Sequence, residues 1–559
     1  MVTRIDTDVV IVGAGLAGLV AAKEASEAGA RVVVLDQENR SNLGGQAWWS
    51  FGGLFLVDSP QQRRLGVKDS VELAWSDWQA TAGFEGEQDA WARRWARDYV
   101  EFAAGEKAAY LRAHGIRLTP MVGWAERGGS LADGHGNSVP RFHIAWGTGT
   151  GVVKPFAADL LEREAAGSTR YLTRHRVGQL LVEEGAVVGV TGTVLAPDAG
   201  ARAQRSNREV VGEFEVRAGA VVLASGGVGG NHELVRSLWP SSLGTPPRTL
   251  LTGVPAHVDG SGLLAAEAAG AHWANRERMW HYTEGIANHS SVWPGHGIRI
   301  LPGPSPLWFD ALGRRLPAPN FPGYDTLATL RHLRSDPEAS RHDHSWFLLT
   351  QRMINKEFAL SGSEQNPDIT EGTALTVLRS RVAGRGAPGP VVAFQERGED
   401  FLAATSLEEL VPRMNALVGE ELVDAATLRR QIEARDLQVA NSFSKDAQVQ
   451  GIHTSRAYLG DRLTRTTAPH RILDPAAGPL LAVRLRVLTR KSLGGIRTDE
   501  HSRALRADGS LLPGLWAAGE AAGFGGGGVH GFRSLEGTFL GGCLFSGLRA
   551  GRSAAAAVA

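Results

Sequence analysis

Three glycines near the start of the chain have the spacing with which a polypeptide backbone can bind a dinucleotide phosphate. Residues 9–12 are four β-favouring residues, and a G-x-G-x-x-G motif follows them directly. In this motif Gly13 permits a sharp turn, Gly15 lets the backbone approach a pyrophosphate, and Gly18 lets a helix pack closely on the strand. The free N–H groups at the start of that helix would then face the phosphates.

An acidic residue follows at the distance expected of a contact to the ribose of such a dinucleotide. The pattern predicts a helix over residues 16–28 and a second buried strand over 31–36. That strand ends in Asp36, whose carboxylate can accept a hydrogen bond from a ribose hydroxyl, and Gln37 comes next. A chain with 70 Gly matches the glycine motif easily by chance, so the prediction of dinucleotide binding depends on this strand-helix-strand context.

A glycine-rich stretch over residues 41–53 shows neither a helical nor an alternating pattern. Two Gly-Gly pairs and adjacent tryptophans are unusual in an exposed loop that binds nothing, so we interpret this stretch as a loop that wraps a flat cofactor. The alternative is a plain surface loop. The residues that the interpretation places at the cofactor are Gly44, Gly45, Gln46, Gly52 and Gly53.

The composition narrows the possible classes of function. The chain has 559 residues, with 59 Lys plus Arg against 59 Asp plus Glu, so no global charge favours nucleic acid or an anionic membrane. The single cysteine, Cys543, excludes an intramolecular disulfide, a cysteine zinc cluster and a C-x-x-C redox pair, so redox chemistry requires a bound cofactor. His342 and His344 do not share a helical face, and no metal site is predicted. No apolar run is long enough to span a bilayer and the first strand starts near Asp8, so we expect a cytoplasmic protein without a signal peptide.

The next elements are expected to form a helical layer and a β-meander. Residues 71–114 read as helical, with aromatic residues at a spacing typical of core packing: Trp75, Trp78, Trp91, Trp95 and Tyr99. Residues 121–154 are glycine-rich, and four of their side chains either line a cleft or rest on the body: Trp124, Arg141, His143 and Trp146. Near residue 171 the apolar period changes to two, which predicts a hairpin over 174–190 and a strand over 213–218.

A later predicted strand resembles the opening one, because a buried apolar run again ends in small residues. Residues 220–223 are apolar, and they deliver Ala224, Ser225 and Gly226 at the carboxyl end of the strand, where open α/β sheets bind ligands. Asp259 precedes a predicted helix, and it either caps this helix or contacts the cofactor.

A change in sequence character predicts a second domain inserted into the first. Prolines, histidines and tryptophans accumulate over residues 273–479, and the periodicity weakens there. Glycines at strand ends then return, with a strand that leads into Gly519 and Glu520. We therefore predict a cofactor domain made of 1–272, with a helical insertion at about 70–150, and of 480–559.

Five motifs, in this order, resemble the flavoprotein family of soluble fumarate reductases and 3-ketosteroid delta-1-dehydrogenases. They are the opening glycines with Asp36, the glycine pairs of 44–53 with Gln46, the segment Ala224 to Gly227, Asp259 with Gly260, and the segment Pro513 to Glu520. The likeness covers about 8–53, 177–270 and 494–547, whereas the middle of the chain matches poorly.

The resemblance implies an α/β fold, with a Rossmann-like FAD-binding domain of the glutathione-reductase type, a β-meander and an inserted α+β domain that caps the substrate. It implies FAD rather than NAD, with the Val177 backbone at the adenine and Glu520 at the ribityl and pyrophosphate groups. The start of the last helix, near Ser534 and Leu535, would aim N–H donors at flavin N1 and the C2 carbonyl, where negative charge grows on reduction. No histidine lies in 42–53, where membrane-bound relatives attach flavin covalently, so we expect non-covalent FAD.

Two departures from the family pattern fall where its chemistry would lie. Fumarate reductases place a histidine before a Gly-Gly motif, whereas this chain has Lys491 in the segment that leads to Gly494. Their arginine near the last helix comes one step later than Arg533, and counting along the motif puts Arg533 where steroid dehydrogenases carry a tyrosine. A dicarboxylate clamp is therefore not expected, because bidentate arginine geometry tolerates little displacement. The residues match neither specialised subfamily.

The leading hypothesis is an FAD-dependent dehydrogenase or reductase that acts on a carbon–carbon bond next to a carbonyl while a side chain moves a proton. The tryptophan-rich cap favours a bulky apolar ketone, such as a steroid-like compound, together with a separate electron acceptor. The rival hypotheses are a fumarate-reductase-like enzyme for small unsaturated dicarboxylates and a non-catalytic flavin-binding electron-transfer module. The candidates for proton transfer or carbonyl polarisation flank cofactor-binding segments or begin the cap: Arg533, His530, Tyr282, His281 and Lys491.

Overall fold

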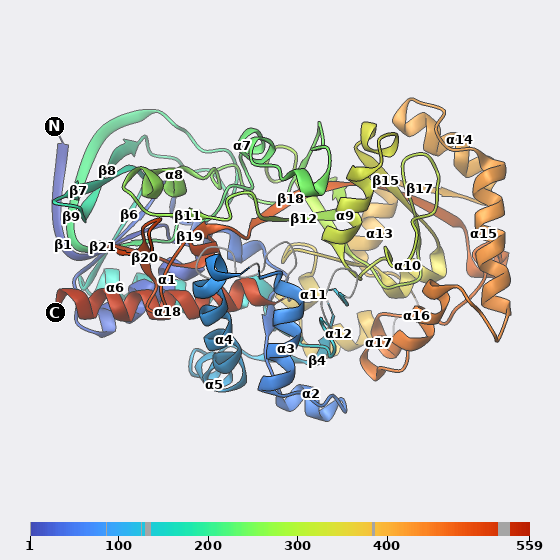
Figure 1. The fold of residues 1–559 in the computed structure, drawn as a ribbon, viewed down its shortest axis with the longest axis horizontal. Coiled ribbons are helices and arrows are strands. Elements are labelled where there is room, and N and C mark those ends of the chain that lie inside the picture. The colour runs from blue at the N-terminus through green and yellow to red at the C-terminus, as the bar shows by residue number, and fades with distance from the viewer. Residues whose placement is uncertain (1, 85, 125, 129–135, 383–385, 524–536) are drawn as a thin grey trace.

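Two large β-sheets organise the protein, one toward each end of its long axis (Figure 1). The computed structural model describes residues 2–84, 86–124, 126–128, 136–382, 386–523 and 537–559. The chain builds most of the first sheet, crosses to the second and returns, so both of its ends lie on the side of the first sheet (Figure 1).

The first sheet is mainly parallel and carries a β-hairpin. Its strands are β1 (Val2–Val12), β2 (Val32–Asp36), β6 (Thr169–Thr173), β7 (His175–Glu183), β8 (Ala186–Leu195), β9 (Val210–Leu223), β20 (Arg503–Leu505) and β21 (Leu511–Ala517). The order is β20-β21-β9-β1-β2-β6, and all neighbours are parallel except β20 with β21. The β7-β8 hairpin joins this sheet because β8 pairs with β9. The predicted α/β fold with a β-meander is confirmed.

The opening strand is apolar because both of its faces are buried. Val10 and Val12 contribute to one hydrophobic core, and Val9 and Ile11 contribute to another. None of these four side chains is more than 7% exposed. The second core is completed by α1 (Leu16–Glu27), α6 (Thr148–Ala165) and α18 (Thr538–Val558). Parallel strands covered on both faces need such uninterrupted apolar runs.

Strand β9 differs from its prediction. The pattern predicts separate strands over 213–218 and 220–223, but the structure has one strand of 14 residues. Its first half pairs with β8 and β1, and its second half pairs with β1 and β21. Gly219 does not interrupt it, because Ala218 and Ala220 on either side keep the alternation of buried and exposed positions. The hairpin and the parallel sheet are thus one continuous surface.

The second sheet is mainly antiparallel and is centred on β18. Its strands are β10 (Leu251–Thr252), β12 (Met279–Ala287), β13 (Gly297–Leu301), β14 (Leu307–Phe309), β15 (His344–Thr350), β16 (Ala359–Leu360), β17 (Phe401–Ala404) and β18 (Leu480–Ser492). Strand β18 pairs with β10, β12, β15 and β17. Residues 480–492 therefore belong to this sheet, and the predicted boundary at 479 falls too early. An apolar strand does not reveal which sheet it joins.

Shorter elements surround the two sheets. Strands β11 (Trp273–Ala274) and β19 (Gly495–Ile496) form a small pair between them. Helices α14 and α15 lie at the far end of the second sheet (Figure 1). Further helices are α2 (Pro60–Arg64), α7 (His232–Ser237), α8 (Ser261–Ala268), α9 (Thr326–Ser335), α10 (Gln351–Glu357), α11 (Pro367–Thr370), α12 (Ala374–Val377), α13 (Gly389–Arg397), α14 (Leu407–Val418), α15 (Ala425–Ala440), α16 (Ala447–Ser455) and α17 (Leu459–Thr464).

The helical insertion packs through an aromatic cluster, as predicted. It consists of α3 (Val71–Ala82), α4 (Ala90–Ala104) and α5 (Glu106–Ala113). Trp78, Trp95 and Tyr99 are buried together with Phe55 and Phe545. The Trp95 and Tyr99 rings stack with centroids 5.2 Å apart. These side chains attach the insertion to α18 rather than bind a ligand.

Side chains of a three-stranded sheet alternate between positions packed in the protein interior and positions that line a cavity. It contains β3 (Gly53–Phe55), β4 (Leu118–Gly123) and β5 (Phe142–Ala145). Arg141 and His143 are buried in packing, with Arg141 paired to Asp69 at 2.7 Å and Asp77 at 2.6 Å. His143 shares a hydrogen bond of 2.6 Å with Ser59. The alternating positions Phe142, Ile144 and Trp146 line a cavity instead.

Arg141→Met should lower the free energy of unfolding by about 3–5 kcal/mol, because it leaves two buried carboxylates without their cation. Chemical denaturation measures this difference. Arg64→Met is the matched control, since Arg64 is exposed at the end of α2 and should cost less than about 0.5 kcal/mol. Equal effects of the two substitutions would contradict a structural role for the Arg141 ion pairs.

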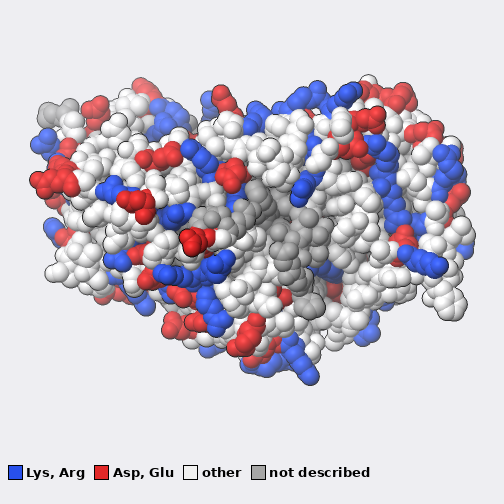
Figure 2. Space-filling view, in the orientation of Figure 1, with Lys and Arg blue, Asp and Glu red and all other residues white. Residues whose placement is uncertain are grey.

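Charges of both signs are interspersed over the visible face of the molecule (Figure 2). Within the described ranges, no helix has the length and apolar character needed to cross a membrane. The same residues contain no group of three His, Cys, Asp or Glu side chains placed to hold a metal ion.

Candidate active site

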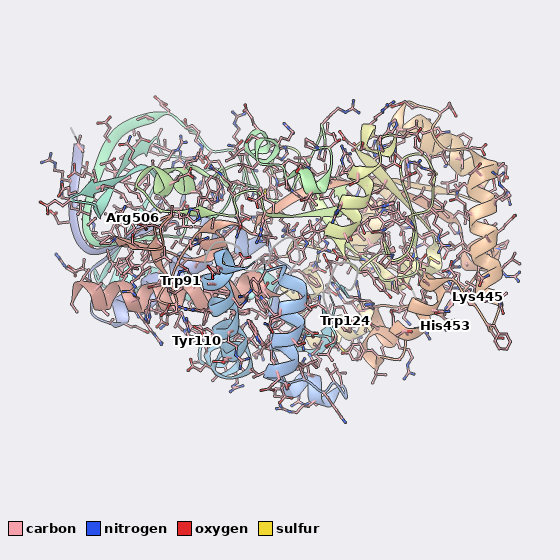
Figure 3. The ribbon with its side chains drawn as sticks, in the orientation of Figure 1. Trp91, Tyr110, Trp124, Lys445, His453 and Arg506 are labelled. Atoms are coloured by element: carbon pink, nitrogen blue, oxygen red, sulfur yellow. The ribbon has the colours of Figure 1, made fainter. Side chains whose placement is uncertain are left out.

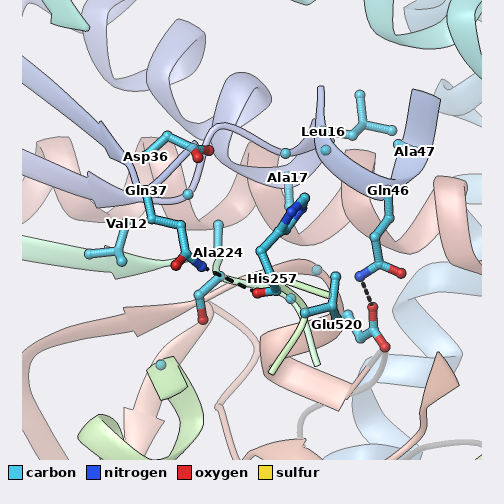
Figure 4. A pocket seen from close by; sticks show the side chains of 18 of the residues that line it. Val12, Leu16, Ala17, Asp36, Gln37, Gln46, Ala47, Ala224, His257 and Glu520 are labelled. Carbon is cyan, nitrogen blue, oxygen red and sulfur yellow. Dashed lines mark hydrogen bonds between the residues drawn. The ribbon is translucent and has the colours of Figure 1, made fainter. Parts of the chain in front are cut away.

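A deep cavity lies at the carboxyl ends of the parallel strands (Figure 4). Its walls come from the turns after β1, β2, β9 and β21, together with the short helix Gly45–Trp49 and the start of α18. In Figure 4 Asp36 and Gln37 lie toward one side and Gln46 and Glu520 toward the other, with Ala224 between them. Segments from both ends of the chain thus form a single site.

The three glycines of the opening motif meet three different constraints. Gly13 has a φ of 104°, and a Cβ there would lie 2.5 Å from the Ala224 carbonyl oxygen. A Cβ on Gly18 would lie 1.9 Å from the Gly13 carbonyl oxygen. A Cβ on Gly15 would meet nothing within 4 Å. The fold itself requires Gly13 and Gly18, whereas Gly15 leaves open space at the start of α1, where a phosphate binds well.

Asp36 is held firmly at the cavity wall by the backbone. Its Oδ2 accepts from the Ala14 N–H and its Oδ1 accepts from the Glu38 N–H, each at 2.8 Å. Burial raises the pKa of the Asp36 carboxyl, and these two hydrogen bonds oppose the shift. Next to it, the Gln37 side chain donates to the His257 carbonyl at 3.2 Å (Figure 4). A rigid carboxylate in this place suits a ribose hydroxyl donor.

Glu520 ties three distant segments together at the other side of the cavity. Its Oε2 accepts from Gln46 Nε2 and its Oε1 accepts from the Ser492 N–H, each at 2.8 Å (Figure 4). Gln46 Oε1 and Ser225 Oγ are buried at the same cavity, and among the described residues neither has a hydrogen-bond partner. Buried polar atoms normally find partners. Together with the open glycine turn and the fixed carboxylate, these two atoms fit a bound dinucleotide.

Most of the predicted cofactor residues line this cavity. They are Gly13, Gly15, Asp36, Gln37, Gly45, Gln46, Val177, Ala224, Ser225, Gly226, Gly519 and Glu520. Gly18, Gly44 and Gly52 shape the surrounding turns, and Gly53 lines the neighbouring compartment. Asp259 Oδ1 accepts from the Ser261 N–H, but Gly260 is the N-cap of α8 and no side chain caps this helix, so the predicted capping role is wrong. Ser534 and Leu535 lie outside the described residues.

A small compartment of about 70 Å³ adjoins the cofactor cavity. Lys491, Phe539 and Leu540 line both spaces, so the two meet at these side chains. Arg299 and Arg490 also face the compartment. A reactant held here would touch the inner edge of the cofactor cavity.

A large, mainly apolar cavity of about 980 Å³ adjoins the compartment. Phe51, Phe142 and Leu301 line both spaces. Trp124 and Trp146, two of the four side chains with open alternatives, also line the large cavity. In Figure 3 Trp124 lies near β4, between the helical insertion and the helices that follow the second sheet. This volume stands at the upper end of the range typical of small-molecule sites.

The two adjacent candidates on β12 face opposite ways. Tyr282 lines the small compartment, and the Arg299 guanidinium carbon lies 3.8 Å from the centroid of its ring. His281 stacks on Trp239 with ring centroids 4.9 Å apart, and burial lowers the pKa of His281 to about 3. His281 is therefore neutral and away from the compartment. His530 and Arg533 lie outside the described residues.

Two arginines of the compartment were not among the predicted site residues. Arg299 is buried on β13, and its Nη2 donates to Glu126 Oε1 at 2.5 Å. The signal in the sequence was a charged residue inside the apolar run 297–301, since such residues are rarely buried unless paired. Arg490 is only half-buried and adjoins Lys491 on β18. Nothing in its own sequence context separates it from an exposed strand residue.

Comparison with known proteins also indicates a protein that binds FAD. The sequence model of a family described as "FAD binding domain" matches residues 8–540. A KsdD-like steroid dehydrogenase of Mycolicibacterium smegmatis is 59% identical over 554 residues, which cover 99% of this chain and 100% of that protein.

Two solved structures share the fold at low sequence identity. The 3-ketosteroid delta1-dehydrogenase of Sterolibacterium denitrificans, in complex with 1,4-androstadiene-3,17-dione, superposes with a TM-score of 0.66 at 16% identity and covers 99% of both chains. The open conformation of a flavocytochrome c3 fumarate reductase gives a TM-score of 0.63 at 19% identity, covering 99% of this chain and 79% of that one.

Proposed function

We propose that this chain, which belongs to the family of FAD-binding flavoenzymes, dehydrogenates a carbon–carbon bond beside the carbonyl of a 3-ketosteroid. The observation that carries the proposal is the shared lining of three spaces. The cofactor cavity meets the small compartment at Lys491, and that compartment meets the large apolar cavity at Phe142. A ketone in the compartment would have its ring system in the large cavity.

FAD held in the cofactor cavity would supply a hydride acceptor, and a separate electron acceptor would be needed to reoxidise it. The chain itself must take the proton from the neighbouring carbon and stabilise the charge that develops on the carbonyl oxygen. We assign this proton transfer to the Tyr282 hydroxyl, because the Tyr282 side chain lines the compartment. Lys491, Arg490 and Arg299 supply positive charge on its walls. Apolar side chains of the adjoining cavity exclude water.

A fumarate-reductase-like reaction is the second candidate, and one observation favours it. Three cationic side chains around a small compartment could hold a small dicarboxylate. The large apolar cavity next to the compartment would then have no role, which is why the steroid ketone is preferred. A third possibility is a flavin-binding module that transfers electrons without its own substrate.

Anaerobic mixing with 3-oxo-4-ene steroids should bleach the absorbance of the bound flavin, and an artificial acceptor should restore it. Fumarate should not reoxidise the chemically reduced protein. Reoxidation by fumarate without bleaching by any steroid would replace the proposal by the dicarboxylate reaction. A flavin spectrum that responds to neither compound would favour the electron-transfer module.

A further inference from the structure

We propose that the large cavity holds an ionised carboxylate at the far end of the substrate, so that a 3-ketosteroid acid is preferred to a neutral 3-ketosteroid. This inference rests on the proposed function and names the class of substrate within it. The observation is a group of cationic side chains in the lining of a mainly apolar cavity: Arg352, Lys356 and Arg465.

Another part of the cavity lining can accept a fused apolar ring system. It is formed by β4, β5 and the residues that follow them, and its side chains are Met121, Val122, Trp124, Phe142, Ile144 and Trp146. Because Phe142 also lines the small compartment, this part of the lining runs from the proposed ketone position into the large cavity. The two parts of the lining therefore differ in chemistry, with one apolar and one positively charged.

The three cations are positioned by main-chain carbonyls rather than by carboxylates. Arg352 Nη2 donates to the Ala476 carbonyl at 3.1 Å, and Lys356 Nζ donates to the Arg462 carbonyl at 2.8 Å. Arg465 Nη2 donates to the Leu301 carbonyl at 2.7 Å. Within the part of the chain that the structure describes, no salt bridge reaches any of the three. These bonds fix the side chains, and although Asp461 and Glu357 lie near enough to Arg465 to attract its charge, neither forms a salt bridge with it.

The remaining charged groups near these cations already have partners. Arg381 pairs with Asp368 at 2.7 Å, and Asp461 pairs with Arg127 at 2.6 Å. Glu357 is buried behind this lining.

The Glu357 carboxyl group already has hydrogen-bond partners within the protein. It accepts hydrogen bonds from Ser305 and from the Thr467 N–H. Burial raises the pKa of the Glu357 carboxyl, and the hydrogen bonds that it accepts oppose this shift. The described lining thus offers net positive charge to an incoming anion.

Arg465 is anchored to the cavity lining by its side-chain hydrogen bond. It bonds the carbonyl of Leu301, a residue that lines both the large cavity and the small compartment. Burial lowers the pKa of Arg465 to about 10, so the guanidinium remains charged at neutral pH. Lys356 is half-buried and Arg352 is exposed at the rim. A carboxylate between Arg465 and Lys356 would form charge-assisted hydrogen bonds, which are stronger than neutral ones.

The test compares a steroid acid with its own neutral amide. We would measure kcat/KM for 3-oxoandrost-4-ene-17β-carboxylic acid and its primary amide on the FAD-loaded protein. The acid should be favoured about ten- to hundredfold, the difference expected of hydrogen bonds to a charged group. In the Lys356→Met/Arg465→Met double variant the ratio should fall close to one, because kcat/KM for the acid should fall much more than kcat/KM for the amide.

Lys445→Met is the matched control, because Lys445 is exposed beyond the cavity wall (Figure 3) and should leave the ratio unchanged. If loss of Arg465 prevents folding, Lys356→Met alone should still lower the ratio, and rising salt should lower it in the unaltered protein. A ratio near one in the unaltered protein, or one that survives both substitutions, would overturn this inference alone. Failure of both acid and amide to reduce the flavin would instead overturn the proposed function.

Discussion

Tyr282→Phe should slow flavin reduction by a 3-ketosteroid by about 10²- to 10⁴-fold, the range expected when a group that moves a proton is lost. The substitution removes the hydroxyl and keeps the ring beneath the Arg299 guanidinium, so the packing of β12 is preserved. The FAD content should be unchanged. Anaerobic stopped-flow measurement of flavin absorbance gives the rate at saturating steroid.

His281→Phe provides the comparison, because His281 is the adjacent residue on the same strand and faces Trp239 rather than the compartment. Phenylalanine can keep the ring stacking, and the neutral imidazole has no charge to lose. Flavin reduction in this variant should remain close to that of the unaltered protein. If Tyr282→Phe also kept its full rate, another group, with Lys491 the next candidate, would have to move the proton.

Gly15→Val should weaken FAD binding by about ten- to hundredfold or more, because added methyl groups would occupy the space that the pyrophosphate needs. The protein itself should tolerate the change. The backbone at residue 15 is extended, with a φ of −73° and a ψ of 174°, and a Cβ there meets no protein atom within 4 Å. The ratio of flavin to protein after purification, and titration of the flavin-free protein with FAD, measure the effect.

Gly386→Val is the control for this prediction, since Gly386 is exposed and its Cβ would also meet open space. That variant should retain full flavin. Acid precipitation should release the flavin from the unaltered protein, as expected of non-covalent attachment. Full occupancy in Gly15→Val would falsify the placement of the pyrophosphate at the start of α1.

The sequence predicted the cofactor cavity well because its signals are local. The run Val9 to Gly18 encodes a strand, a turn and a helix within one short segment, and Asp36 follows from the next strand. The helix and the second strand appear where the pattern indicates them, but the first strand begins at Val2 rather than near Asp8, because its polar first half pairs with β9. Parallel sheets bring the ends of such strands to one edge, so residues from distant turns could be expected to meet there.

The substrate side could be predicted only in part, because it depends on how strands pair over long distances. Residues 480–492 carry an apolar pattern that suits either sheet, and only the structure shows that they pair with β12 and β15. Tyr282 and His281 are neighbours in sequence, and their opposite directions follow from the strand itself. Which of the two faces the compartment depends on the register of β12 with β18.

The hydrogen bonds of Glu520 to Gln46 and to the Ser492 backbone place one of the last segments of the chain in the wall of the cofactor cavity. During translation the opening strand, turn and helix leave the ribosome hundreds of residues before η8 (Gly519–Ala522) and α18 exist. Until then the glycine turn has only part of its cavity wall. Loading of flavin must therefore wait for synthesis of the last segments, and a nascent chain carries the dinucleotide motif for most of its production without a complete place to bind it.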